Sequence, residues 1–421
     1  MRFLLACLVM GLLGTPPLQA AYFSQVFPSG ENTPSATVDQ YNTIGGGAGW
    51  NTTENNRKGL IADNGTLTRF RVTLASAVGA GTSLVLSVRL NGVSTALSCT
   101  FNDDVTTTCL DTDEVAATAG QEISIFSDVT NTPATSLATY SVIFLPSTQN
   151  LNLYNSGTSA TNLSNSATNY IPPHATNVPT TTEFLAGMLM PFSGTLTAFY
   201  AETSGAAGSG NSYTFTVRKN ATTATNFTCA ISGASATTCN DVTGGTDSSF
   251  VVGDYLTIES VPASTPTARL GWFGIALQPD DPGVFAFSGV YDTSDAVNTV
   301  FNRVYAAIDS SWSTTGANRD EEANGCVAQA IYVNLSADPD NGVGTQSYAL
   351  TLLDDGSSAG TPTCTVSQGS TTCSQTGQSY DIEGGSILLL QDVPANTPTV
   401  VNSQISFLLF NTPRRITGGG D

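Results

Sequence analysis

The chain has 421 residues, of which 40% are hydrophobic and only 11% charged, and its formal net charge is -20. An average soluble protein has roughly 25% charged residues, so the polar surface here must come from Ser, Thr, Asn and Gly, which favour strands and turns over helices. The acidic excess excludes the broad basic face that a DNA- or RNA-binding protein needs, and we expect no nucleic acid among the partners.

Residues 1–20 have the pattern of a secretory signal peptide. Arg2 provides the positive start, the apolar run 3–13 is too short to span a bilayer, and Ala20 precedes the expected cleavage point. No later apolar run reaches 18 residues, so we expect no transmembrane segment in the mature chain. The protein is therefore expected to be secreted or displayed at a cell surface, where disulfides are permitted.

Three similar units follow, which we place at 21–147, 148–281 and 282–421. Each unit carries a pair of cysteines, a glycine before a late apolar segment and a proline shortly after that segment, all repeating with a period of about 132 residues. These markers are Cys99 and Cys109, Cys229 and Cys239, Cys364 and Cys373; Gly120, Gly253 and Gly385; and Pro133, Pro266 and Pro398.

The paired cysteines predict one disulfide in each unit, between neighbouring strands of a hairpin. A bridge that closes about ten residues stabilises by roughly 2–3 kcal/mol on the chain-entropy estimate. A zinc site is the alternative, but the spacing does not match one. Removal of the signal peptide would take Cys7 with it and leave one further cysteine, Cys326, which the alignment of Gly325 with Gly65 and Gly194 places on a strand. We expect it to keep its thiol as a small, half-buried residue, with an intermolecular disulfide as the alternative.

Alternation of apolar and polar residues runs through each unit. In "SLVLSVRL" (83–90), "SYTFTVRK" (212–219) and "SYALTLLD" (347–354), every second residue is apolar, which is typical of antiparallel strands with one buried face. Turn signals follow the first and third of these strands, and a long apolar strand ends each unit near a proline. The pattern predicts an all-β chain of three tandem antiparallel β-sandwich domains, jelly-roll-like, with seven to nine strands each.

The segments that precede each core differ in length and sequence, and any function that differs between the copies is expected there. The segment 295–309 has apolar residues spaced three and four apart, which indicates a helix. Trp50 and Trp312 lie in these segments and are our candidates for glycan contact, whereas Trp272 lies in a closing strand and is assigned to the core.

Candidate catalytic residues are few. His174 is the only histidine, and no nucleophile motif accompanies it, so we interpret it as a surface loop residue. The carboxylate clusters lie in no recognisable catalytic frame, and we predict no catalytic residue and no cofactor. "DPDNG" (338–342) resembles the start of a calcium loop, with Asp338, Asp340 and Asn341 as ligands of a weak structural site; a plain turn is the alternative, because Ala349 stands where the bidentate Glu is expected.

The arrangement "GTLTAFYAETSGAAGSGNSYTFTVRKN…C…C…GDYLTIES…STPTA…GWFGIALQP" resembles the tandem sandwich repeats of bacterial surface proteins and of phage tail or fibre proteins. The resemblance covers about two thirds of the mature chain. It implies a jelly-roll-like fold and an extracellular or virion-surface setting, and it transfers no catalytic residue. The signal peptide favours an exported protein over a virion protein.

We therefore expect a secreted, non-enzymatic structural protein of a cell surface, filament or extracellular matrix. A lectin-like adhesion protein is the alternative, and a secreted glycan-active enzyme is the third hypothesis. The expected partners are other copies of the chain or surface glycans. Self-association could use the apolar terminal segment 21–27, which either pairs within its own first unit or is donated to the open sheet edge of a neighbour.

Overall fold

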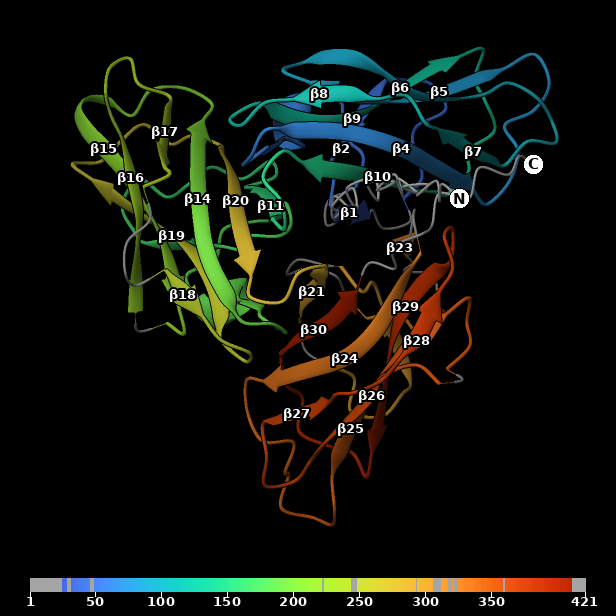
Figure 1. Ribbon diagram of the computed structural model, residues 1–421, viewed down its shortest axis with the longest axis vertical. Coiled ribbons are helices and arrows are strands. Elements are labelled where there is room, and N and C mark those ends of the chain that lie inside the picture. The colour runs from blue at the N-terminus through green and yellow to red at the C-terminus, as the bar shows by residue number, and fades with distance from the viewer. Residues whose placement is uncertain are drawn as a thin grey trace, which may run out of the picture.

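The computed structural model describes residues 25–410, apart from 29–31, 46–48, 222, 244–247, 293, 306–311, 317–319, 322–324 and 359. The chain forms three lobes around a common centre, and each lobe is one of the three repeats (Figure 1). The predicted signal peptide lies outside the described residues. The all-β prediction is confirmed, because the regular structure of the described residues consists of antiparallel strands and two short 3-10 turns, η1 (Glu54–Asn56) and η2 (Glu183–Ala186).

Each repeat contains two five-stranded sheets, made by ten consecutive strands. The sheets of the first repeat are β1 (Gln25–Pro28), β10 (Ala138–Pro146), β4 (Gly65–Leu74), β7 (Thr108–Asp111) and β8 (Val115–Ala117); and β2 (Gln40–Asn42), β9 (Glu122–Thr130), β5 (Ser83–Leu90), β6 (Val93–Phe101) and β3 (Gly59–Leu60).

The second repeat pairs its strands in the same order. Its sheets are β11 (Asn152–Gly157), β20 (Gly271–Pro279), β14 (Gly194–Thr203), β17 (Thr238–Asp241) and β18 (Ser249–Phe250); and β12 (Asn169–Ile171), β19 (Tyr255–Ala263), β15 (Gly208–Lys219), β16 (Thr223–Gly233) and β13 (Met188–Leu189).

The third repeat follows the same scheme. Its sheets are β21 (Val284–Tyr291), β30 (Ser403–Phe410), β24 (Cys326–Leu335), β27 (Thr372–Gln375) and β28 (Tyr380–Ile382); and β22 (Val300–Asn302), β29 (Ile387–Ala395), β25 (Ser347–Asp354), β26 (Thr363–Ser367) and β23 (Asp320–Glu321).

The strand order is that of a jelly roll. When the two short added strands of each repeat are set aside, the eight others lie in the orders 1-8-3-6 and 2-7-4-5, so the chain crosses repeatedly between the two sheets. The alternating segments of the sequence form central strands, as predicted. Leu86, Phe215 and Leu350 are almost fully buried between the sheets, as are the apolar residues two positions before and after each of them. Burial of these alternate residues fixes which face of each strand points inward.

The three predicted disulfides are present, but the local geometry differs from the prediction. Cys99 lies on β6 and Cys109 on β7, and these are edge strands of different sheets. The second and third repeats repeat this arrangement between β16 and β17 and between β26 and β27. Each bridge therefore ties the two sheets together at one open edge of the sandwich and is not a link within one hairpin.

The predicted helix at 295–309 is wrong where the structure describes it. Val300–Asn302 is the short strand β22, which pairs with β29, and Val297 is 73% exposed. The apolar spacing there reflects a strand and a loop, because Val300 and Val304 reach the core from an extended segment. Residues 306–309 lie outside the described part of the chain.

The first strand of each repeat pairs with the last strand of the same repeat. β1 pairs with β10, β11 with β20 and β21 with β30. Of the two arrangements considered for segment 21–27, residues 25–27 adopt the pairing within their own repeat, and residues 21–24 lie outside the described residues. Donation of this strand to a neighbouring molecule stays a prediction.

The three repeats close into a ring through one contact that recurs at each junction. Strand β3 lies against β11 and β20 of the second repeat, β13 lies against β21 and β30 of the third, and β23 lies against β10 of the first. The contact joins different surfaces, and such head-to-tail contacts form a ring when the rotation closes. The chain is thus a pseudo-threefold assembly of three jelly rolls, with β1, β11 and β21 toward the centre (Figure 1).

The strand pairing also corrects the alignment of Cys326. Gly65 pairs with Ala117, Gly194 with Phe250 and Cys326 with Ile382, which are equivalent pairs in the three repeats. Cys326, and not Gly325, therefore occupies the position of Gly65 and Gly194. It is 1% exposed and takes part in no disulfide, so it is a buried core residue and not a half-buried one.

Candidate functional site: the junctions between repeats

The first junction joins the first and second repeats through polar contacts around Trp272. The indole N–H of Trp272 donates to the Asn55 carbonyl oxygen at 2.9 Å. The Lys58 ammonium lies 5.1 Å from the centre of the same indole ring, and it also forms an ion pair with Glu122 at 2.7 Å. Trp272 is buried, as predicted, but its surroundings include the neighbouring repeat and not only its own core.

The second junction has a hydrogen bond equivalent to the Trp272–Asn55 bond, but a different side chain donates it. Gln404 stands at the position of Trp272, and its side-chain amide donates to the Phe184 carbonyl oxygen at 2.7 Å. Asn55 and Phe184 both lie in the 3-10 turn of the preceding repeat. The two junctions therefore share one hydrogen bond, formed by a tryptophan in one case and a glutamine in the other.

Glycine allows the close approach of the backbone at the first junction. A Cβ added to Gly274 of β20 would lie 2.5 Å from the Leu60 carbonyl oxygen of β3, a distance at which something must shift. No side chain fits between these two strands, so the short strand β3 packs directly on the backbone of β20.

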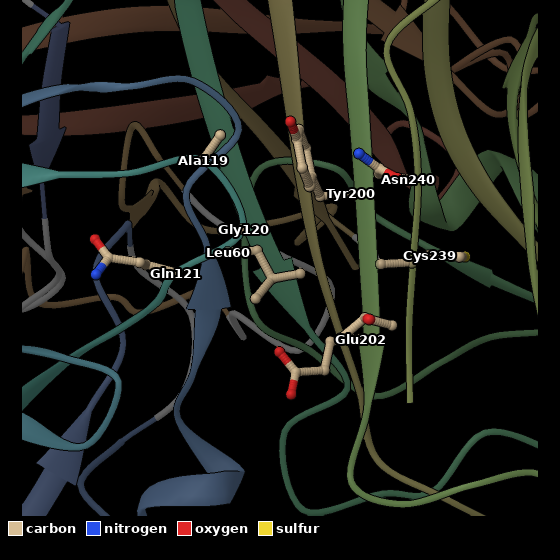
Figure 2. A pocket seen from close by; sticks show the side chains of 10 residues that line it. Leu60, Ala119, Gly120, Gln121, Tyr200, Glu202, Cys239 and Asn240 are labelled. Atoms are coloured by element: carbon tan, nitrogen blue, oxygen red, sulfur yellow. The ribbon is translucent and has the colours of Figure 1, made fainter. Parts of the chain in front are cut away.

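A hollow of about 430 Å³ lies beside this contact (Figure 2). The first repeat provides Leu60 and the turn 119–121, and the second repeat provides residues of β14 and β17. Tyr200 and Glu202 are two positions apart on β14, and both side chains point outward. Tyr200 pairs with Asn240 of β17, and Glu202 pairs with Thr238. One aromatic ring, one carboxylate, one amide and one hydroxyl therefore share the same wall.

The electrostatic setting of Glu202 is unusual for a surface carboxyl. Its pKa is raised from 4.5 to about 7: burial at the junction is the main cause, the nearby Glu122 carboxylate contributes to the rise, and the Lys58 ammonium opposes it. The side chains of Glu202 and Asn240 have no hydrogen-bond partner among the residues that the structure describes. Both are therefore able to bind a molecule that enters the hollow.

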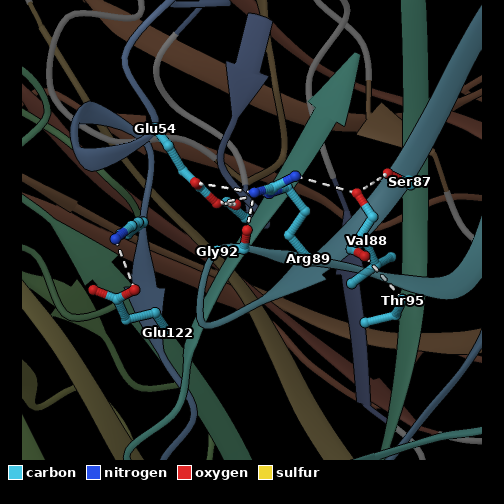
Figure 3. Close-up of polar contacts among 10 residues, drawn as sticks. Glu54, Ser87, Val88, Arg89, Gly92, Thr95 and Glu122 are labelled. Carbon is cyan, nitrogen blue, oxygen red and sulfur yellow. Dashed lines mark hydrogen bonds and ion pairs between the residues drawn. The ribbon is translucent and has the colours of Figure 1, made fainter. Parts of the chain in front are cut away.

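A second polar cluster occurs in the first two repeats, on the outer face of the other sheet. Arg89 forms an ion pair with Glu54 at 2.9 Å, and the Ser124 hydroxyl donates to the same Glu54 oxygen at 2.8 Å. Figure 3 shows the Arg89 guanidinium held between Glu54 and the Gly92 carbonyl oxygen. In the second repeat, Glu183 pairs with Arg218 at 2.9 Å and accepts from the Thr257 hydroxyl at 2.9 Å.

The third repeat replaces this cluster by apolar residues. Strand register and the neighbouring isolated bridges place Gly316, Leu353 and Leu389 at the positions of Glu54, Arg89 and Ser124. These residues line a hollow of about 370 Å³, together with Phe301. The third repeat thus has neither the glutamate nor the arginine, so neither charge is left there without its partner.

The two tryptophans predicted to contact glycans lie at equivalent places and face inward. The Trp50 indole N–H donates to the Asn32 carbonyl oxygen at 3.3 Å, and the ring packs on Tyr140. The Trp312 indole N–H donates to the Asp292 carbonyl oxygen at 3.1 Å, and the ring packs on Tyr291. Both rings are partly buried against the core, and glycan contact by either tryptophan stays a prediction.

The segment predicted to bind calcium is a series of tight turns. The Asp338 carboxylate accepts from the Asp340 and Gly369 N–H groups, and the Asp340 carboxylate accepts from the Gly342 N–H. The Asn341 side-chain oxygen accepts from the Val343 N–H. Among the described residues, no group of three His, Cys, Asp or Glu side chains is placed to hold a metal ion. Calcium binding stays a prediction.

The prediction that His174 is a surface loop residue is wrong. His174 is fully buried, and its ring packs edge-on against Tyr305 of the third repeat, with 5.5 Å between ring centres. Gly45 of the first repeat approaches the same tyrosine. Strand register makes Gly45, His174 and Tyr305 equivalent residues, and they meet at the pseudo-threefold axis. His174 and the two prolines before it lie in a connection that becomes buried when the three repeats close on one another. The sequence of one chain does not show this burial.

Neither the family models nor the curated proteins give a match to this chain. Within the described residues, no helix has the length and apolar character needed to cross a membrane. Sequence reasoning did not find Tyr200, Glu202 and Asn240. The sequence could have indicated them only through differences between the three copies at outward-facing strand positions. Glu202, for example, stands where the first repeat has Thr73 and the third repeat has Asn334.

Proposed function

We propose that the protein is a secreted, non-enzymatic building block of a surface layer or extracellular matrix. The observation that supports this proposal is the ring itself. Three jelly rolls, each tied by one disulfide, close on one another through a repeated contact and form a three-lobed plate (Figure 1). Such a unit is stiff, because its junctions use backbone packing and buried side chains.

The rim of the plate has three equivalent edges. Strands β6, β16 and β26 are the outer edges of one sheet in each repeat, and they lie away from the centre (Figure 1). An edge strand presents unpaired N–H and C=O groups, which can pair with another chain. Three such edges around a threefold unit favour growth in two dimensions, so we propose a layer in preference to a linear filament.

The test compares two triple variants by electron microscopy and light scattering over a range of protein concentrations. Thr100, Ala230 and Thr365 are exposed residues of the edge strands, each directly after the first cysteine of its repeat. Changing all three to Lys should abolish ordered assembly. The matched control places Lys at Asp128, Val261 and Val393, which are equivalent exposed positions on the inner strands β9, β19 and β29.

Wild-type protein that remains monomeric at every concentration would contradict the proposal, as would edge variants that still form ordered arrays.

A glycan-binding adhesion protein is the second candidate function. The observation that favours it is the hollow at the first junction, where an aromatic ring and polar side chains share one wall.

A further inference from the structure

The hollow at the first junction has walls that the fold holds fixed. One wall is the outward face of β14 and β17, where strand pairing sets the positions of Tyr200, Glu202 and Asn240. The other is the turn 119–121, and a Cβ added to Gly120 would lie 3.7 Å from the Tyr200 ring. The Trp272–Asn55 hydrogen bond and the Lys58–Glu122 ion pair hold the two repeats together beside it. A ligand would therefore meet a site that is already formed.

Tyr200 and its neighbours form the kind of surface that binds a sugar ring. A tyrosine ring offers an apolar face with a polar tip, and the C–H face of a sugar can pack on it. Glu202 and Asn240 stand on either side, and neither side chain has a hydrogen-bond partner among the described residues. Together they supply acceptors and donors for hydroxyl groups. The volume, about 430 Å³, lies in the range of small-ligand sites.

The charges around the hollow disfavour an anionic ligand and give a cationic one no free path past Lys58. Glu202 lines it, the Glu122 carboxylate is near enough to act on Glu202, and the whole chain carries a formal charge of -20, so anions are repelled. The one cation that faces Glu202, Lys58, is paired with Glu122 and packed on Trp272. A cationic ligand would meet the Lys58 ammonium close to Glu202, whereas a neutral ligand is repelled by none of these charges.

The other two junctions supply an internal comparison. At the second junction, Tyr332 and Asn334 take the places of Tyr200 and Glu202, and the Asn334 amide donates to the Gln404 side-chain oxygen at 3.0 Å. At the third junction the equivalent residues are Arg71 and Thr73, and the Arg71 guanidinium lies against Gly385. Within the described residues, only the first junction combines the tyrosine with a carboxylate that has no hydrogen-bond partner.

We propose that the hollow between the first and second repeats binds a neutral glycan, with Tyr200 packing on a sugar ring and Glu202 and Asn240 binding its hydroxyl groups. This site goes beyond the structural role, since it lies within one chain and does not require assembly. The site does not include Trp50 or Trp312, the residues that the sequence suggested for glycan contact. It also predicts that the second and third junctions do not bind the glycan.

The experiment uses the full mature chain under conditions where it is monomeric. Saturation-transfer NMR and calorimetric titration are carried out with uncharged oligosaccharides of glucose, galactose, mannose and N-acetylglucosamine, two to four units long. Spermidine and oligosaccharides that contain glucuronate serve as cationic and anionic probes. The variants are Tyr200→Ala, Glu202→Gln and Asn240→Ala, and Tyr332→Ala is the matched control at the second junction.

At least one neutral oligosaccharide should bind and saturate. We expect Tyr200→Ala to weaken its binding about tenfold or more, and Glu202→Gln and Asn240→Ala severalfold each, while Tyr332→Ala leaves it unchanged. Asn240 is exposed, so its variant keeps the test decisive even if Tyr200→Ala disturbs the junction. The proposal is overturned if no neutral oligosaccharide binds, if only a charged probe binds, or if Tyr332→Ala weakens binding as much as Tyr200→Ala.

Discussion

Asp392 is a buried carboxyl that should make the third repeat less stable as the pH rises from about 4 to about 8. It is 0% exposed, and it lies on β29 between Val300 and Leu350 of the neighbouring strands. Its pKa is raised from 3.8 to about 8: burial is the main cause, the Ser294 hydroxyl opposes the rise, and the Asp295 carboxylate contributes to it. No hydrogen bond of normal geometry reaches either Asp392 oxygen among the described residues. The equivalent residues of the other repeats are Ser127 and Ser260.

The sign of the effect follows from proton binding. The folded state holds a proton on Asp392 up to about pH 8, whereas the unfolded chain releases it near pH 3.8. The folded state therefore loses stability as the pH rises from about 4 to about 8, and the loss is complete above that range. Each pH unit corresponds to about 1.4 kcal/mol, so the difference of about four units gives an upper limit of about 6 kcal/mol.

The test is Asp392→Ser, which installs the residue that the other two repeats use. Denaturant unfolding from pH 5 to pH 9, followed by the fluorescence of Trp312 in the same repeat, should show a stability advantage of the variant that grows with pH and levels off above pH 8. Asp128→Ser is the control, because Asp128 is exposed on the equivalent strand of the first repeat. An advantage that does not change with pH would refute the reasoning.

Three further outcomes follow from the site and the core. Glu202→Gln should stabilise the first junction above pH 7 by about 1 kcal/mol, after allowance for solvent screening of this half-exposed group, and should have no effect below about pH 4; thermal unfolding across this pH range measures it. Replacing Cys229 and Cys239 by Ser should lower the free energy of unfolding by about 2–3 kcal/mol, measured in denaturant against the oxidised wild type. Arg89→Leu alone should cost about 2–3 kcal/mol, because it leaves Glu54 without its cation, and adding Glu54→Gly should recover much of this loss in a double-mutant cycle.

The fold class and the repeat could be predicted because they depend on local pattern. Alternation in segments such as 83–90 requires one buried face, and the repeated cysteines mark the same point in each copy. The disulfides were predicted correctly as pairs, but their place in the sandwich was not. A short connection between two cysteines is compatible with a hairpin and with a crossing between sheets, and only long-range strand pairing distinguishes the two.

The candidate site could not be predicted, because it lies between repeats. The sequence shows the residues that each repeat turns outward, but not which outward faces meet. Tyr200 and Gly120 contact one another only because the ring closes, and the same closure buries His174. Trp50 and Trp312 were predicted to contact glycans because they are aromatic residues in variable segments. In the structure each is partly buried and packs against the core of its own repeat.

Cys326 and Ile382 of the third repeat occupy the positions that Gly194 and Phe250 occupy in the second repeat. A Cβ added to Gly194 would lie 2.9 Å from the Phe250 ring and 2.3 Å from the Gln278 carbonyl oxygen, whereas Ile382 replaces Phe250 beside Cys326. The Cys326 side chain therefore takes space that an aromatic ring fills in the second repeat. We expect Cys326→Gly to cost about 1–3 kcal/mol through the cavity it leaves.

The exchange can be tested in the opposite direction. Gly194→Cys should destabilise the second repeat by at least as much, because the added atoms meet backbone as well as the Phe250 ring. Adding Phe250→Ile should restore part of this loss, since it reproduces the pair Cys326 and Ile382. Denaturant unfolding of the four proteins gives the coupling energy between the two positions. If Gly194→Cys unfolds at the same denaturant concentration as the wild type, or if Phe250→Ile makes it less stable still, the packing explanation for Cys326 is wrong.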